Sequence, residues 1–478
     1  ATERGRSDSL FIDEMNGILS GGSVGTFEQL SSRTSIETKG TVILGNHKFK
    51  VGLEYREIST DAYDLYNTVE QSGDSLYQTH YNLVDGTVGS RIPSAFIQDS
   101  WQAHRRWRIN AGVRWDGQFM LDSNDDVAQK ITDQFQPRVG FVYQPGELGT
   151  QKIFGSFGRF YQDIGTLLSA AYHIEGITWQ GIKYDHDPRF DSSGGDTLYS
   201  MSSSIHPEVD DLEGQHYDEF TLGYERQIGN LWKFGATGVY RTLQQGVEDA
   251  VVAAVGDFRY GNPGKGLLSE YPEMKREYAG LVLTAERSGG EHFNFLASYV
   301  LSRTEGNYSG LFNQDFGWGQ PNFNGDFDIL EMTENFDGLL ANDRTHKLKF
   351  LGSYRTNFGL TMGTFFMWQS GTPKSICEGS SWGSPYWAFV EERGSAGRTP
   401  SIWDLNIRFA YDLPSLARAT MHPRLLLDVF HLGSQREAVQ FDQIRSFYPD
   451  GEEPNPTFGL ATQYQPPTAV RLGMEVSF

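Results

Sequence analysis

A single cysteine, Cys377, stands in the 478 residues, so the chain cannot form an internal disulfide and has no cysteine-rich metal site. Basic residues are also scarce: 40 Lys and Arg against 61 Asp and Glu give a formal net charge of −21. That balance argues against nucleic acid as a partner, because phosphate binding needs a basic surface. No GxSxG, HExxH, P-loop or CxxC motif is present. We therefore expect neither an enzyme nor a cofactor protein.

Long hydrophobic runs are missing as well, since no window approaches the roughly 18 apolar residues that a transmembrane helix needs. Aromatic residues, by contrast, make up 14% of the chain and Gly reaches 54 residues, although hydrophobic residues account for only 38%. A membrane β-barrel can have this composition, because only every second residue of a strand meets lipid and the lumen is polar.

Apolar and polar residues alternate over many short segments. In 107–116 the apolar set is Trp107, Ile109, Ala111, Val113 and Trp115, and polar residues or Gly stand between them. The segments 47–57 and 403–412 repeat the pattern. Successive strand residues point to opposite faces, so each segment has one apolar and one polar wall. The sequence predicts an all-β protein.

The connections between these segments alternate in length, which favours a transmembrane antiparallel β-barrel over a soluble sandwich or propeller. Short links face the periplasm in such barrels, and long loops face outward. We expect residues 1–33 to be an extracellular loop or partial strand, and 34–478 to be the barrel. About 15 or 16 strands are visible, a number that fits either a 16-stranded, porin-sized barrel or part of a larger one. The long loops are expected at about 60–92, 163–216, 242–276, 303–345, 371–401 and 433–467.

The last segment ends the chain on an aromatic residue. Leu472, Met474, Val476 and Phe478 lie on one apolar face that alternates with polar residues or Gly. This pattern resembles the signal that the barrel assembly machinery reads in outer-membrane proteins. An ordinary edge strand is the alternative, but such a free apolar edge would promote aggregation of a soluble protein.

Seven phrases stand in order along the chain: HKFKVG (47–52), FIQDSW (96–101), INAGVRW (109–115), QPRVGF (136–141), GSFGRFY (155–161), NDRTHKL (342–348) and QSGTP (369–373). In this order they resemble the barrel of TonB-dependent outer-membrane receptors of the Oar-like type, which carry a carboxypeptidase-regulatory-like domain and a plug before the barrel. The resemblance implies that the strands seen here are part of a 22-stranded barrel. The resemblance implies a bacterial outer-membrane protein that imports a bulky nutrient such as a siderophore, oligosaccharide or peptide. It also implies coupling to TonB through a plug that we do not find in this sequence. We expect outer-membrane lipid and the barrel assembly machinery as further partners.

Two other functions stay open from the residues alone. A passive porin-like channel would follow if 16 strands close without a plug. A structural or docking role would follow if the loops bind a surface-exposed partner protein and no solute passes.

Candidate ligand contacts are aromatic side chains in the long loops, because sugars and aromatic ligands stack on such faces. Packing between loops is the alternative for each of them. They are Trp179, Tyr184, Trp318, Trp382, Tyr386 and Trp387. Asp343, Arg344 and His346 precede or begin a strand, where rim salt bridges or ligand contacts are expected.

Acidic loop stretches could in principle hold calcium, because hard cations want several carboxylates. The two stretches are Asp185, Asp187 and Asp191, and Asp326, Asp328 and Glu331. Neither matches an EF-hand, so we expect acidic solvated loops and predict no metal site.

Overall fold

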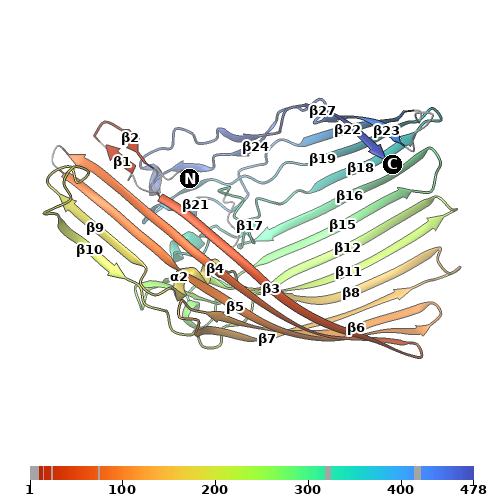
Figure 1. The fold of residues 1–478 in the computed structure, drawn as a ribbon, viewed down its shortest axis with the longest axis horizontal. Coiled ribbons are helices and arrows are strands. Elements are labelled where there is room, and N and C mark those ends of the chain that lie inside the picture. Colours follow the sequence, from red (N-terminus) through yellow and green to blue (C-terminus); the bar gives the residue numbers. More distant parts are fainter. Residues whose placement is uncertain are drawn as a thin grey trace.

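The computed structural model describes residues 10–477 except 14, 23–24, 74–75, 318–323 and 414–420. Within this part, long strands follow one another in a single antiparallel sheet that curves around a concave face (Figure 1). The fold class is confirmed: the protein is all-β, and 15 strands of the barrel type are paired in chain order. They are β3 (Gly25–Leu44), β4 (His47–Gly73), β5 (Leu76–His104), β6 (Trp107–Leu121), β7 (Val127–Tyr143), β8 (Gln151–Tyr161), β11 (His216–Ile228), β12 (Trp232–Gln245), β15 (Arg276–Arg287), β16 (Phe293–Gly306), β18 (His346–Arg355), β19 (Leu360–Gln369), β22 (Ile402–Asp412), β23 (His422–Phe430) and β27 (Ala469–Ser477).

The pleat separates an apolar outer wall from a polar inner wall. Leu53, Leu222 and Leu472 project from the outer wall and are 61%, 62% and 79% exposed. Leaving such a side chain in water instead of an apolar medium costs about 1.5–3 kcal/mol each. A whole wall of them is stable only against hydrocarbon, which is what the alternating sequence predicts for a barrel.

The inner wall is identified by the chain segment that folds onto it. A short helix, α2 (Thr166–His173), follows β8 and lies within the concave face (Figure 1). Arg56 of β4 donates a hydrogen bond to Asp163, with 2.7 Å between Nη1 and Oδ2, and Thr60 donates to Thr166 at 2.9 Å. No helix was expected from the sequence, since α2 spans only eight residues and its pattern is too short to stand out.

Six short connections lie at one end of the sheet, at the right of Figure 1. They are 45–46, 105–106, 144–150, 229–231, 288–292 and 356–359. Gly45 and Gly229 adopt φ values of +58° and +60° in their turns, a region that L side chains rarely enter. The tight Gly45-Asn46 link therefore sets the register of β3 and β4.

The expected loop at 60–92 is wrong: this segment is a long strand hairpin. β4 and β5 stay paired from His47–Trp101 to Gly73–Leu76. At about 3.3 Å per residue, strands of 27 and 29 residues reach far beyond a membrane core of about 30 Å. The projecting part is covered, because β9 (Thr178–Tyr184) pairs with β5 and β1 (Leu10–Asp13) pairs with β4. The segment 60–92 is therefore strand and not loop, and part of it pairs with segments that are distant in the sequence.

Two more segments hold more strand than the sequence pattern suggested. β6 and β7 remain paired through Gln118–Ile131 to Leu121–Val127, so that only residues 122–126 link them. β3 begins at Gly25, well inside the segment 1–33 that was expected to be a loop or partial strand. β2 (Ile18–Gly21) also lies there and pairs with β1.

The long connections carry small elements of their own at the end opposite the short turns. They are β10 (Asp196–Ser202), β13 (Glu248–Val252), β14 (Asp257–Gly261), η1 (Gly266–Leu268), η2 (Leu330–Thr333), β17 (Gly338–Leu339), β20 (Cys377–Ser380), β21 (Gly383–Phe389), β24 (Ala438–Phe441), β25 (Ile444–Ser446), η3 (Pro449–Gly451) and β26 (Ala461–Tyr464). The buried cores of the molecule lie mostly among these connections, and the one around Phe327 and Cys377 joins several of them. We call these packed connections the loop crown. In the described part of the chain, none of the helices has the length and apolar character needed to cross a bilayer.

Candidate functional site

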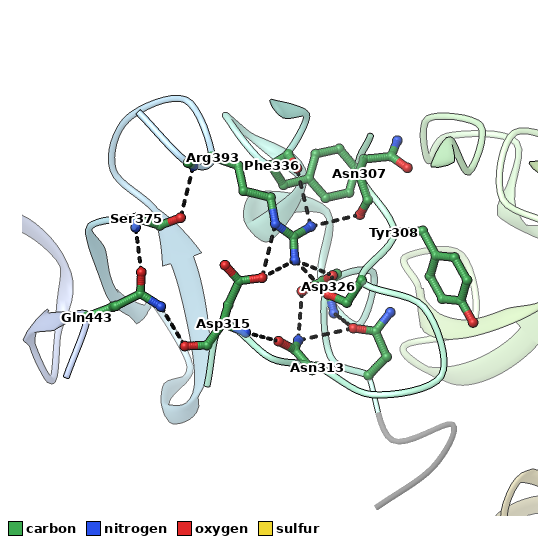
Figure 2. Close-up of polar contacts among 12 residues, drawn as sticks. Asn307, Tyr308, Asn313, Asp315, Asp326, Phe336, Ser375, Arg393 and Gln443 are labelled. Atoms are coloured by element: carbon green, nitrogen blue, oxygen red, sulfur yellow. Dashed lines mark hydrogen bonds and ion pairs between the residues drawn. The ribbon is translucent and has the colours of Figure 1, made fainter. Parts of the chain in front are cut away.

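The loop crown is organised around one fully buried guanidinium, that of Arg393 (Figure 2). Arg393 forms ion pairs with Asp315 and Asp326. It also donates to the backbone oxygen of Asn307 at 3.2 Å and to the hydroxyl of Ser309 at 2.6 Å. These partners come from the connection between β16 and β18, whereas Arg393 belongs to the connection between β19 and β22. The guanidinium therefore locks two loops together.

Electrostatics in this cluster follow from burial. Burial lowers the pKa of Arg393, but the charges and hydrogen bonds of Asp315 and Asp326 outweigh it and raise that pKa overall. Burial raises the pKa of Asp315, and the charge of Arg393 opposes the shift. Removing one partner from such a buried group costs about 3–5 kcal/mol, because the remaining charge has no water to replace it. The loop crown is thus a rigid body held by a specific polar network.

A third loop joins this cluster through Gln443. Its side-chain amide donates to the Asp315 backbone oxygen at 2.6 Å and accepts from the Ser375 amide at 2.5 Å (Figure 2). The connection between β23 and β27, which holds Gln443, is therefore fixed against the other two. This network was not predicted from the sequence, because its members are far apart in the chain and match no motif.

The acidic stretches that could have held calcium are engaged with protein groups. Asp326 pairs with Arg393, and Asp187 pairs with Arg189 at 2.6 Å. The His186 ring lies 2.6 Å from an Asp185 carboxylate oxygen. Among the described residues, no group of three or more His, Cys, Asp or Glu side chains is arranged to hold a metal ion.

The candidate aromatic contacts separate into buried and exposed side chains. Tyr184 and Trp387 are buried, at 6% and 7% exposure, and Trp179 packs against the core under β4 and β5. For these three the structure favours packing between loops. Trp382 is 53% exposed and its ring meets that of Tyr386 edge-on at 5.8 Å, so this pair still offers a stacking surface. Trp318 lies outside the described residues.

The final strand places its apolar row on the outer wall. Leu472 lies opposite Leu427, Met474 opposite Leu425, and Val476 opposite Pro423. Met474 is 67% exposed. Phe478 lies outside the described residues, and the role of this row as an assembly signal stays a prediction.

The inner wall carries ion pairs between strands that are adjacent or separated by one strand. Glu54 of β4 pairs with Arg114 of β6 at 2.8 Å. Towards the C-terminus, Asp428 of β23 pairs with Arg408 of β22 at 2.5 Å and with Arg471 of β27 at 2.7 Å. These groups give the lumen a charged lining that suits water and polar solutes.

Several depressions among the described residues are large enough to hold a ligand group, and three of them bear on the site. One of about 1090 Å³ lies on the apolar outer wall, where Phe157, Phe220 and Leu281 line it, so hydrocarbon fills it in a membrane. A second, of about 480 Å³, lies along the strands β5–β8 and includes the inner-wall residues Arg114 and Arg138.

The third depression, of about 420 Å³, lies in the loop crown, and we call it the crown cavity. Its lining comes from three loops: Phe312, Gln314, Gly317, Ala341, Arg344, Thr372, Pro373, Lys374, Thr399, Val439, Gln440, Phe441, Gln443 and Gln463.

Of the rim residues expected near position 343, Asp343 forms a salt bridge, with Arg398. The His346 ring instead forms a hydrogen bond with the Tyr299 hydroxyl at 2.7 Å. Arg344 instead donates to the backbone oxygen of Ser370 at 2.6 Å and lines the crown cavity.

Comparison with known proteins gives a consistent result. A family model described as "TonB dependent receptor-like, beta-barrel" matches residues 5–430. The chain is 27% identical over 486 aligned residues to the TonB-dependent transporter Oar of Myxococcus xanthus, covering 87% of this chain and 45% of that protein. It thus spans less than half the length of this curated relative.

Solved structures share the fold. The outer membrane transporter YddB from Escherichia coli superposes with a TM-score of 0.59 at 15% identity, over 99% of this chain and 58% of that one. The siderophore receptor PiuA from Acinetobacter baumannii gives 0.55 at 12% identity, over 96% of this chain and 57% of that one.

Proposed function

Because the chain belongs to the TonB-dependent receptor-like β-barrel family, we propose that it forms the larger part of the barrel of an outer-membrane importer. The observation that carries this proposal is the division of the sheet into an apolar outer wall and a charged inner wall under a packed loop crown. The outer wall meets lipid, the inner wall surrounds the solute path, and the crown contacts the solute first. The solute is bulky, such as a siderophore, oligosaccharide or peptide.

The geometry of the sheet supports a barrel that has more strands than the described residues form. β3 and β27 are the two edges, and in the described residues they are not paired with each other. Both run from the loop crown to the short-turn end, because an even number of antiparallel steps separates them. An odd number of further strands is therefore needed for antiparallel closure, and about seven would complete a transporter barrel of about 22 strands. We propose that a part of the protein outside this sequence supplies them, together with the plug.

Partners follow from the family. We propose that transport is energised through TonB acting on that plug, and that the barrel assembly machinery inserts the protein by way of the β27 row. Cellular location in the bacterial outer membrane is part of the same proposal.

The test uses the full-length protein in its bacterial host. Uptake of the solute, measured with a labelled compound that supports growth, should disappear when either the receptor gene or the TonB gene is deleted. Uptake that persists without TonB would favour the passive porin, as would a steady open conductance of the full-length protein in planar bilayers. A surface docking protein would show neither uptake nor conductance, while crosslinking on cells would trap a partner on the loops.

A further inference from the structure

The crown cavity carries positive charge in a chain that is otherwise strongly acidic. Arg344 and Lys374 both line it, and none of the described residues that line it is Asp or Glu. The formal net charge of the whole chain is −21, so the cavity is opposite in sign to the chain as a whole. Charge in a concave site with low-dielectric walls acts over a longer range than charge on an open surface.

Neither cation is neutralised by the described part of the chain, where no carboxylate lies within ion-pair distance of the Arg344 guanidinium or the Lys374 ammonium group. Asp343 stands next to Arg344 in the chain, but its carboxylate is taken by Arg398 and by the backbone amide of Thr304 at 2.8 Å. The Lys374 ammonium group lies 5.2 Å from the centre of the Phe441 ring, which attracts a cation without neutralising it.

Arg344 is held in place with donors to spare. One Nη1 bond to the Ser370 backbone oxygen fixes the guanidinium, and four of its five N–H groups are left for other acceptors. Partial burial lowers the pKa of Arg344, and the nearby charge of Arg398 lowers it further. An anion bound in the cavity would offset both the burial of the Arg344 charge and its repulsion by Arg398.

Positive charge continues from the cavity onto the inner wall. Lys347 and Lys349 follow on β18, on the face opposite Leu348 and Phe350. Their register partners on β16, Val300 and Ser298, belong to the same inner wall. Neither lysine is ion-paired with a carboxylate in the described residues. The cations thus form a path from the crown into the lumen.

We propose that the crown cavity binds a carboxylate group of the imported solute through Arg344 and Lys374. This inference rests on the proposed function and narrows it to anionic solutes. A cavity of about 420 Å³ accommodates a group of several heavy atoms, so it is a subsite for one end of a bulky solute. Gln314, Gln440 and Gln463 offer amide donors around the two cations.

The experiment compares two probes of similar shape, the dianion succinate and its neutral diamide, succinamide. Binding to the full-length protein in detergent is measured by ligand-observed NMR titration. We expect succinate to bind and succinamide not to bind. Arg344→Gln and Lys374→Gln should each weaken succinate binding about tenfold, because each removes a charge-assisted hydrogen bond.

Controls separate charge from folding. Lys374→Arg should keep most of the binding, and Lys265→Gln should leave it unchanged, because Lys265 lies in another loop and pairs with Glu213. Heat-modifiable electrophoretic mobility shows whether each variant still folds into a barrel. Equal binding of the two probes, no binding of either, or full binding by the double variant Arg344→Gln/Lys374→Gln would overturn the proposal. TonB-dependent uptake can survive any of these results, so failure here is distinguishable from failure of the importer assignment.

Discussion

Replacing Arg393 with Met tests whether the loop crown depends on its buried ion pairs. The substitution keeps much of the side-chain volume but leaves Asp315 and Asp326 in a site where each is only 2% exposed. Loss of one partner from such a pair costs about 3–5 kcal/mol. Because the affected contacts link loops, we expect local opening of the crown while the strand pairing of the sheet persists.

The assay is hydrogen exchange of the full-length protein in detergent, read by mass spectrometry. Amides of β20 and β21 and of residues 307–317 should exchange at least about a hundredfold faster in Arg393→Met, as that free energy implies. Lys265→Met is the matched control, since the Lys265–Glu213 pair is 47% and 45% exposed and contributes about 0–1 kcal/mol. Unchanged hydrogen exchange in Arg393→Met would show that the buried ion pairs do not hold the loops together.

Three further outcomes are expected. Burial lowers the pKa of His173 from 6.5 to about 4, so the unfolded chain binds the proton more tightly than the folded chain does. The free energy of unfolding therefore keeps its full value above pH 6.5. It falls by about 3 kcal/mol as the pH drops towards 4. Hydrogen exchange of α2 at pH 7.5 and 5 measures this loss, and His173→Gln should abolish the pH dependence. Trp382→Ala should weaken solute binding without a change in the hydrogen exchange of the loop crown. Trp387 is only 7% exposed, so Trp387→Ala should destabilise the loop crown by about 3–5 kcal/mol. Equal hydrogen exchange in the two variants would contradict the exposed role of Trp382 and the buried role of Trp387. Asp428→Asn should lower the fraction of folded barrel on gels, because it weakens the attachment of β27 through Arg471. The loss should be small, because both arginines that pair with Asp428 are more than half exposed.

The repeating parts of the fold could be predicted from the sequence, because the period of two is a local signal. One wall of β6 is predicted from its own apolar residues, Trp107, Ile109 and Val113, without knowledge of any other strand. The hairpin of β4 and β5 beyond the membrane could not be predicted in this way. Its polar residues look like a loop, and they form strand because β9 and β1, distant in the chain, pair with them.

The candidate site was predictable only in part. Aromatic residues in loops were visible in the sequence, but whether each is buried depends on which loops meet. Trp387 ended in the core and Trp382 on the surface, although only five positions separate them. Arg393 and Arg344 are each one arginine in a loop, and their roles arise from three connections that fold together. No local sequence pattern predicts that these three connections pack against one another.

The central claim is that one wall of each strand touches hydrocarbon and the other touches water. Spin labels attached to Leu222→Cys and Thr221→Cys in the full-length protein in lipid vesicles test it directly, and the native thiol does not interfere because Cys377 is fully buried. We expect the label at 222 to collide with oxygen and to be shielded from a water-soluble nickel chelate, and we expect the label at 221 to show the reverse. Equal access of the nickel chelate to both positions would contradict it.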